Sequence, residues 1–181
     1  MQDEEEMVDV VDENNEVVGK SSRKEAHVRG HIHRALSVLI LNSKGQILLQ
    51  KRSANKSVHP LAWDLSTSEH LLSGESYEEA GVRSVKEELG VEASVITATE
   101  ATLQRREYQV GGKTVYENEI VLMLRAEHEG PFKVDPAEVH SAEFFTVEEI
   151  EKKIRDKEEF TIWFLDEWEN VKKITSVREA K

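Results

Sequence analysis

The sequence predicts a sandwich of the α/β or α+β class, and two observations lead to this prediction. Short apolar runs that are typical of strands are interleaved with a few helical segments along the 181 residues. Capping boxes, in which a Ser or Thr is followed three residues later by a Glu, predict helix starts at Ser22, Ser76 and Thr146. The length suits one substantial core, so we predict one domain over residues 1–181.

The first fifty residues predict two hairpins and a short helix. Apolar segments 8–11 and 17–19 flank Asn14 and Asn15, which are typical hairpin residues. The helix that Ser22 starts would carry His27. An apolar run at 35–41, a turn at 42–45 and a strand at 46–50 predict a second hairpin.

The strongest helix prediction lies between the cap residue Ser76 and Gly90, a residue typical of helix ends. Three apolar residues at helical spacing should face the sheet: Val82, Val85 and Leu89. Three polar residues at i, i+3 and i+4 should share another face, so both carboxylates can point one way: Ser84, Glu87 and Glu88.

The rest of the chain predicts strands followed by two helices. Strands are expected at 94–97, 103–110, 114–125 and 142–145, with Gly111 and Gly112 forming the turn between the second and third. Thr146 opens a helix, and an amphipathic helix closes the chain at 160–173. Large apolar residues of this helix are Trp163, Leu165 and Trp168.

Composition and charge exclude several classes of function. The chain has no cysteine, which excludes disulfides, Cys-ligated metals and thiol nucleophiles. A net charge of −12 repels a nucleic-acid backbone, so we expect no nucleic-acid partner. No apolar run approaches the ~20 residues of a membrane-spanning helix. The acidic stretch at residues 1–6 is unlike a signal peptide, so we expect a cytoplasmic protein.

Residues 69–91 resemble the Nudix box, G-x5-E-x7-R-E-U-x-E-E-x-G-U. The matching positions are Glu75, Arg83, Val85, Glu87, Glu88, Gly90 and Val91. Clustered carboxylates on one helix face suit Mg²⁺ or Mn²⁺, whose coordination shell a diphosphate can complete. The box's first glycine is Glu69 here, and the glutamate after its arginine, commonly a metal ligand, is Ser84. The resemblance implies an α/β/α sandwich with a mixed central sheet.

A second resemblance extends over nearly the whole chain, to the isopentenyl diphosphate isomerase (type I) branch of the Nudix superfamily. It is carried by Glu25-Ala-His27, His33-Arg-Ala, Gln50-Lys-Arg52, Trp63, His70, Gly74-Glu75-Ser76, Glu117-Asn-Glu119 and Phe160-Thr-Ile-Trp163. In the isomerase, three histidines and two glutamates bind one divalent metal. The matching positions are His27, His33, His70, Glu117 and Glu119.

The same resemblance implies roles for further residues. Glu119 would be an acid or base, and Glu88 would serve a second metal on the substrate diphosphate. Trp163 would stack against a cationic intermediate. Basic side chains expected to hold the diphosphate are Arg52, Lys56 and Arg23. Ser68 stands where the isomerase has its catalytic cysteine, and a hydroxyl is a poor proton donor or acceptor at neutral pH.

Three functions therefore remain open. The favoured one is a divalent-metal-dependent hydrolase of an organic or nucleoside diphosphate, with Glu87 and Glu88 on Mg²⁺ or Mn²⁺ and help from Glu119 or the histidines. The second is isomerisation of isopentenyl diphosphate with Ser68 in place of the cysteine. The third is a non-catalytic diphosphate binder. The sequence does not reveal the oligomeric state.

Overall fold

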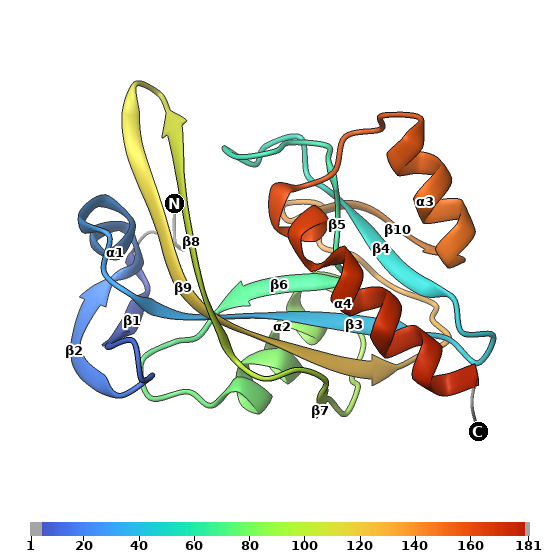
Figure 1. Cartoon of the computed structure of the whole chain (residues 1–181), viewed down its shortest axis with the longest axis horizontal. Helices are drawn as coiled ribbons and strands as arrows, with labels where there is room; N and C mark the ends of the chain where they lie inside the picture. Colours follow the sequence, from blue (N-terminus) through green and yellow to red (C-terminus); the bar gives the residue numbers. More distant parts are fainter. Residues whose placement is uncertain (1–4, 180–181) are drawn as a thin grey trace.

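A mixed sheet of ten strands runs through the computed structural model, which describes residues 5–179 (Figure 1). Residues 1–4 of the acidic start lie outside the described residues. The strands are β1 (Met7–Val11), β2 (Val17–Ser22), β3 (His33–Leu41), β4 (Ile47–Arg52), β5 (Trp63–Asp64), β6 (Thr67–His70), β7 (Ile96–Thr97), β8 (Thr102–Val110), β9 (Lys113–Glu127) and β10 (Val139–Phe145). The helices are α1 (Arg23–Arg29), α2 (Tyr77–Leu89), α3 (Val147–Arg155) and α4 (Ile162–Glu179).

Helices cover both faces of the sheet, which confirms the predicted α/β/α sandwich. Alternate residues of β3 point to opposite faces. Leu36 and Val38 belong to a buried cluster that includes Val85 of α2. Leu39 belongs to a second cluster, which includes Ile150 of α3 and residues of α4. The central strand is therefore apolar on both faces, as expected for a strand covered on each side.

Strand β3 is the centre of the sheet and explains its mixed character. It pairs in parallel with β9 from His33 opposite Glu119 onward, and antiparallel with β6, where Ala35 lies opposite His70. The long β8–β9 hairpin projects beyond the sheet (Figure 1). Its turn is at Gly111 and Gly112 as predicted, and both glycines have positive φ.

One local prediction holds only in part, and two are wrong. The second predicted hairpin forms, but β3 and β4 pair only at Leu41 and Ile47, because β6 and β9 take the two edges of β3 and leave β4 to pair with β5 and β10. His70, which the sequence predicts in the loop before the helix that Ser76 caps, instead ends strand β6. Val82 is 38% exposed, because α2 turns Gly81 and Val85 toward the sheet.

Gly81 shows why α2 can lie so close to the sheet. A Cβ at Gly81 would come within 2.5 Å of a methyl carbon of Leu124 in β9. The helix therefore approaches the strands at this point more closely than any residue with a side chain would allow. The cap residue Ser76 and the C-terminal Gly90 lie where the sequence predicts them.

Candidate functional site

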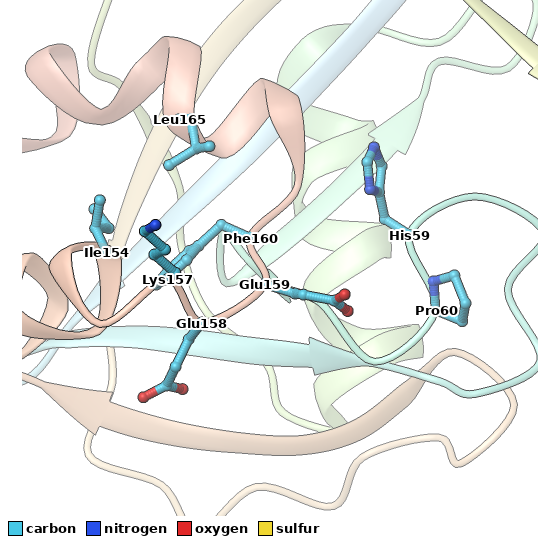
Figure 2. Close-up of a pocket in the computed structure, with 8 residues that line it drawn as sticks. All are labelled: His59, Pro60, Ile154, Lys157, Glu158, Glu159, Phe160 and Leu165. Atoms are coloured by element: carbon cyan, nitrogen blue, oxygen red, sulfur yellow. The ribbon is translucent and has the colours of Figure 1, made fainter.

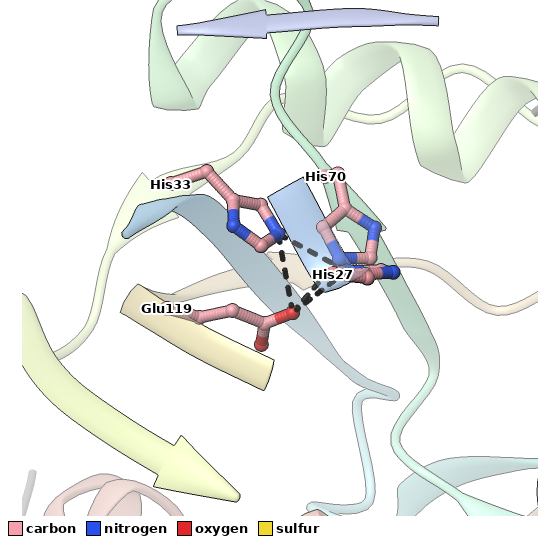
Figure 3. A group of neighbouring side chains, drawn as sticks. All are labelled: His27, His33, His70 and Glu119. Carbon is pink, nitrogen blue, oxygen red and sulfur yellow. Dashed lines mark hydrogen bonds and ion pairs between the residues drawn. The ribbon is translucent and has the colours of Figure 1, made fainter. Parts of the chain in front are cut away.

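Three histidines and one glutamate from four separate elements converge at one end of the central strands (Figure 3). His27 comes from α1, His33 from the start of β3, His70 from the end of β6 and Glu119 from β9. The parallel register sets His33 opposite Glu119, and the antiparallel register brings His70 beside Ala35. Strand pairing thus brings together residues that are far apart in sequence.

The distances within this histidine–glutamate group suit a metal ion. Oε1 of Glu119 lies 2.8 Å from Nε2 of His70, 3.7 Å from Nε2 of His33 and 4.0 Å from Nε2 of His27. The Nε2 atoms of His27 and His33 are 3.2 Å apart. Ligands at ~2.1 Å from a tetrahedral metal are about 3.4 Å from one another. Only small shifts separate these atoms from such a shell.

The protonation states also suit a metal. Burial, followed by the charge of His33, lowers the pKa of His27 to about 4. Burial likewise holds the pKa of His70 well below its usual value. Burial alone would raise the pKa of Glu119, but the hydrogen bond that its carboxylate accepts from His70 lowers it below the usual range. Neutral imidazoles and a carboxylate are the forms that bind cations.

One hydrogen bond orients His33, and one atom of His70 has none. Nδ1 of His33 lies 2.9 Å from the carbonyl oxygen of His31, which can only accept, so Nδ1 carries the proton. The Nε2 lone pair of His33 then faces the group, as in metal-binding histidines. Nδ1 of His70 is buried and lacks a hydrogen-bond partner among residues 5–179. Oε1 of Glu69 is 4.0 Å away from it.

Glu117, which the resemblance includes among the metal ligands, lies outside the group of four. It points to the same face of β9 as Glu119 but is two residues away, or ~7 Å along the strand. Its carboxylate accepts a hydrogen bond of 2.9 Å from the hydroxyl of Tyr108. Burial, followed by the charge of Glu119, raises the pKa of Glu117 to about 7.

The two glutamates of α2 do not point the same way, contrary to the prediction. Glu87 has a side chain that is 60% exposed and pairs with Arg83 at 3.3 Å. Glu88 is buried, and its Oε2 accepts a hydrogen bond of 2.9 Å from Nε2 of Gln50 in β4. Neighbouring helix residues are turned by about 100°, which separates the two carboxylates.

Glu88 has a carboxylate oxygen without a hydrogen bond to any of residues 5–179, and so has the amide of its partner Gln50. Its Oε1 and the Oε1 of Gln50 are both buried without a partner in the described part of the chain. Burial, followed by the charge of Glu69, raises the pKa of Glu88 well above its usual value. A buried carboxylate with a free oxygen requires a proton or a cation. Carboxylate and amide oxygens are the types of ligand that suit Mg²⁺ and Mn²⁺.

Ser84 is sealed inside the protein and presents nothing to a metal. Its side chain is fully buried. Its hydroxyl lies 2.8 Å from that of Thr67 and donates to the carbonyl oxygen of Gly81.

Ser68 lies two residues before His70 in β6, so both side chains point to the same face of the sheet. The hydroxyl of Ser68 is 3.3 Å from that of Ser37.

The four residues predicted to bind substrate already have partners in the protein. Arg52 lies 3.3 Å from Asp64, and its guanidinium carbon is 5.1 Å from the ring of Trp163. Lys56 forms an ion pair with Glu138. Arg23 approaches two carboxylates at 3.8 and 3.9 Å.

Sequence reasoning missed Tyr108, Asp64 and Gln50. A signal existed for Tyr108, because the turn at residues 111–112 fixes the hairpin register and sets Arg106 opposite Glu117. Tyr108 is then a diagonal neighbour of Glu117, within reach of an aromatic side chain. No comparable signal exists for Asp64 or Gln50, whose partners come from elements distant in sequence.

A groove of about 610 Å³ lies apart from the histidine–glutamate group, between the 53–62 loop and the junction of α3 and α4 (Figure 2). Its lining residues are His59, Pro60, Ile154, Lys157, Glu158, Glu159, Phe160 and Leu165. His59 also contacts Trp163, with ring centroids 5.4 Å apart.

Among residues 5–179, no helix combines the length and the apolar character needed to cross a bilayer.

Comparisons with known proteins identify relatives that match nearly the whole chain. Isopentenyl-diphosphate Delta-isomerase 1 of Photorhabdus laumondii is 34% identical over 169 residues, which cover 92% of this chain and 94% of that protein. An uncharacterized Nudix hydrolase of Listeria monocytogenes is 32% identical over 176 residues, covering 93% and 96%.

The crystal structure of DR0079 from Deinococcus radiodurans aligns with a TM-score of 0.73 and 26% identity, over 93% of this chain and 99% of that one. The family model of the NUDIX domain matches residues 31–171, a range that contains α2 and three members of the histidine–glutamate group. The chain belongs to the NUDIX family.

Proposed function

We propose that this chain is a divalent-metal-dependent hydrolase that cleaves an organic or nucleoside diphosphate. The convergence of His27, His33, His70 and Glu119 on one point carries the metal dependence of this proposal. The NUDIX assignment and the relatives named as hydrolases and isomerases support an enzyme that acts on a small diphosphate. The proposal includes a cytoplasmic location and a single domain over residues 1–181.

Two sets of ligands would hold cations of different character. The three imidazole nitrogens favour Mn²⁺ over Mg²⁺, whereas the oxygens of Glu88 and Gln50 suit either ion. When bound, a divalent cation neutralises the diphosphate and makes its bound water more acidic. Glu69 neighbours His70, and its charge contributes to raising the pKa of Glu88.

Hydrolysis is favoured over isomerisation by two features of this chain. Ser68 has a hydroxyl where the isomerase branch has a thiol, so proton exchange at neutral pH would be poor. The ring of Trp163 already carries the guanidinium of Arg52 at 5.1 Å. A second positive charge on the substrate would be repelled there, whereas a phosphate would be attracted.

A panel of diphosphates with Mg²⁺ or Mn²⁺, scored for phosphate release and for deuterium uptake from deuterated water, tests the proposal. We expect phosphate release and no deuterium uptake. Glu88→Gln should abolish turnover, because it removes the charge that holds the cation. Glu87→Gln, on the same helix but exposed, is the matched control and should retain activity. Full activity of Glu88→Gln would eliminate the proposed role.

Isomerisation of isopentenyl diphosphate is the second candidate, since its relatives match nearly the full chain. Ser68 also lies on the same strand face as His70. Deuterium incorporation by the wild-type protein, strongly raised in Ser68→Cys, would favour this candidate. A third possibility, a non-catalytic binder, would show thermal stabilisation by diphosphates without either reaction.

A further inference from the structure

Asp64 is a fully buried carboxylate that joins three elements of the fold. Its Oδ1 accepts hydrogen bonds from Nε1 of Trp163 at 2.7 Å and from the hydroxyl of Thr161 at 3.1 Å. The same oxygen accepts from the backbone N–H of Leu65 at 2.8 Å. Its Oδ2 lies 3.3 Å from NH1 of Arg52. Asp64 therefore connects β5 to β4 and to the start of α4.

Arg52 is held on its other side by the 53–62 loop. Nε and NH2 of Arg52 donate to the carbonyl oxygen of Val58 at 3.3 and 3.2 Å. Together with the bond to Asp64, these contacts use three of the five N–H groups of the guanidinium. The other two have no hydrogen bond to a residue in the described range 5–179. Arg52 is thus held in one position with two N–H groups left to bind a ligand, and its side chain is 15% exposed.

Ring contacts connect Arg52 to the strand that carries the glutamate of the histidine–glutamate group. Its guanidinium carbon lies 5.1 Å from the ring of Trp163, and Trp163 packs edge-on against His59 at 5.4 Å. His59 packs in turn against Tyr108 at 6.3 Å, and the hydroxyl of Tyr108 donates to Glu117 in β9. Arg52 is therefore linked by contacts to the region where the diphosphate of the proposed reaction would bind.

We propose that Asp64 is a positioning residue, which holds Arg52 and Trp163 as one rigid wall and aims the free N–H groups of Arg52 at a substrate phosphate. This inference rests on the proposed function, because it assigns Arg52 to the diphosphate. An arginine fixed before the ligand arrives loses less side-chain entropy on binding than a free one. The buried carboxylate of Asp64, 3.3 Å from NH1, orients the guanidinium through a charge-assisted hydrogen bond.

Asp64→Asn tests the inference, with Thr161→Val as the matched control. Both variants weaken a hydrogen bond at Oδ1, but only the first removes the charge that faces Arg52. Inorganic pyrophosphate, titrated by calorimetry, serves as the probe. We expect Asp64→Asn to weaken pyrophosphate binding at least tenfold and to leave Mn²⁺ binding unchanged. Thr161→Val should stay within twofold of the wild type.

A spectroscopic signature separates positioning from a general loss of structure. With 5-fluorotryptophan incorporated, the ¹⁹F signal of Trp163, assigned through Trp163→Phe, should shift in Asp64→Asn while those of Trp63 and Trp168 do not. A shifted Trp163 signal with pyrophosphate affinity within twofold of wild type would overturn the inference. So would a wild-type protein that does not bind pyrophosphate.

A second variant covers the case in which Asp64→Asn fails to fold. Trp163→Phe deletes the hydrogen bond of 2.7 Å to Asp64 together with the indole ring that lies against Arg52, and it introduces no buried charge. We expect it to weaken pyrophosphate binding severalfold, and unchanged affinity would overturn the inference. Binding is measured without turnover, so a wild-type protein that binds pyrophosphate but hydrolyses no diphosphate would refute the proposed function alone.

Discussion

Glu69 stands at the position of the box's first glycine and has two contacts with His70. Its Oε1 accepts a hydrogen bond from the backbone N–H of His70 at 2.8 Å and lies 4.0 Å from the unpartnered Nδ1 of the same residue. When Nε2 of a histidine binds a metal, its Nδ1 carries the proton, and a carboxylate is a common acceptor for it. Glu69 thus places a carboxylate oxygen near the one buried nitrogen of His70 that has no hydrogen bond within residues 5–179, where a small movement would make it the acceptor.

Glu69→Gln should therefore weaken Mn²⁺ binding about tenfold or more, since loss of such an outer partner typically costs 10–100-fold. Glu87→Gln is the control, because Glu87 and Glu69 both pair with Arg83. Calorimetric titration of Mn²⁺ into the two variants measures the difference. Equal affinities would show that Glu69 does not support His70.

Glu117 makes the stability of the metal-free protein depend on pH. Its pKa is raised from 4.5 to about 7 in the folded state, first by burial. Between pH 4.5 and about 7, the carboxyl group of Glu117 is deprotonated in the unfolded chain but still protonated in the folded one. Stability contributed by this group is therefore present below pH 4.5 and is lost as the pH rises to about 7.

Glu117→Gln should remove this loss. In the presence of EDTA, the melting temperature of the variant relative to wild type should be higher at pH 8 than at pH 4.5. Glu107→Gln, an exposed change on the paired strand β8, should show no such trend. A constant difference between Glu117→Gln and wild type across this range would contradict the raised pKa.

At the scale of elements, α1 reaches the histidine–glutamate group through a contact at its C-terminal end. Nδ2 of Asn118 in β9 donates to the carbonyl oxygen of Gly30 at 2.8 Å. Gly30 has a φ of +70°, and a Cβ there would lie 3.1 Å from that Nδ2. Glycine suits both the left-handed backbone and the close approach, whereas any other residue would press a Cβ against Asn118. This contact fixes the helix that carries His27.

Gly30→Ala should therefore weaken Mn²⁺ binding, because it displaces α1 from β9. It should also cost about 1–2 kcal/mol of stability for the left-handed backbone. Gly45→Ala is a matched control, since Gly45 has a φ of +76° with nothing within 4 Å of its Cβ position. It should lose similar stability and keep its Mn²⁺ affinity. Equal effects of both variants on the metal would contradict the role of this contact.

Local signals predicted the elements well, and long-range pairing accounts for the errors. The side chains of Ser22, Ser76 and Thr146 cap α1, α2 and α3 as expected, because capping depends on residues within one turn. The partners of β3 could not be read from adjacency in the chain, since β6 and β9 are distant in sequence. The short strands β5 and β6 were missed for the same reason.

The candidate site follows the same division. The resemblance placed His27, His33, His70 and Glu119 in one group, and the strand register brings them together. Spacing on α2 suggested that Glu87 and Glu88 act together, but the helix turns only Glu88 inward. The Asp64 contacts depend on α4 packing beside β5, which no local pattern in the sequence encodes.

At the scale of the whole molecule, the histidine–glutamate group lies where helix α1 meets the central strands of the sheet. Its four ligands come from α1, β3, β6 and β9. In the unfolded chain these residues are separated by up to 92 positions, from residue 27 to residue 119. A metal that binds all four would therefore bind the folded state far better than the unfolded one.

Mn²⁺ should accordingly raise the melting temperature of the EDTA-treated protein. A ligand at one hundred times its Kd stabilises the folded state by about 2.7 kcal/mol, which corresponds to roughly 5–10 °C for a chain of this size. His70→Ala should abolish the rise, because it removes the ligand that contacts Glu119 most closely. His140→Ala, an exposed histidine on β10, should retain it. Thermal melts with and without Mn²⁺ measure all three proteins, and an equal rise in His70→Ala would show that the ion binds elsewhere.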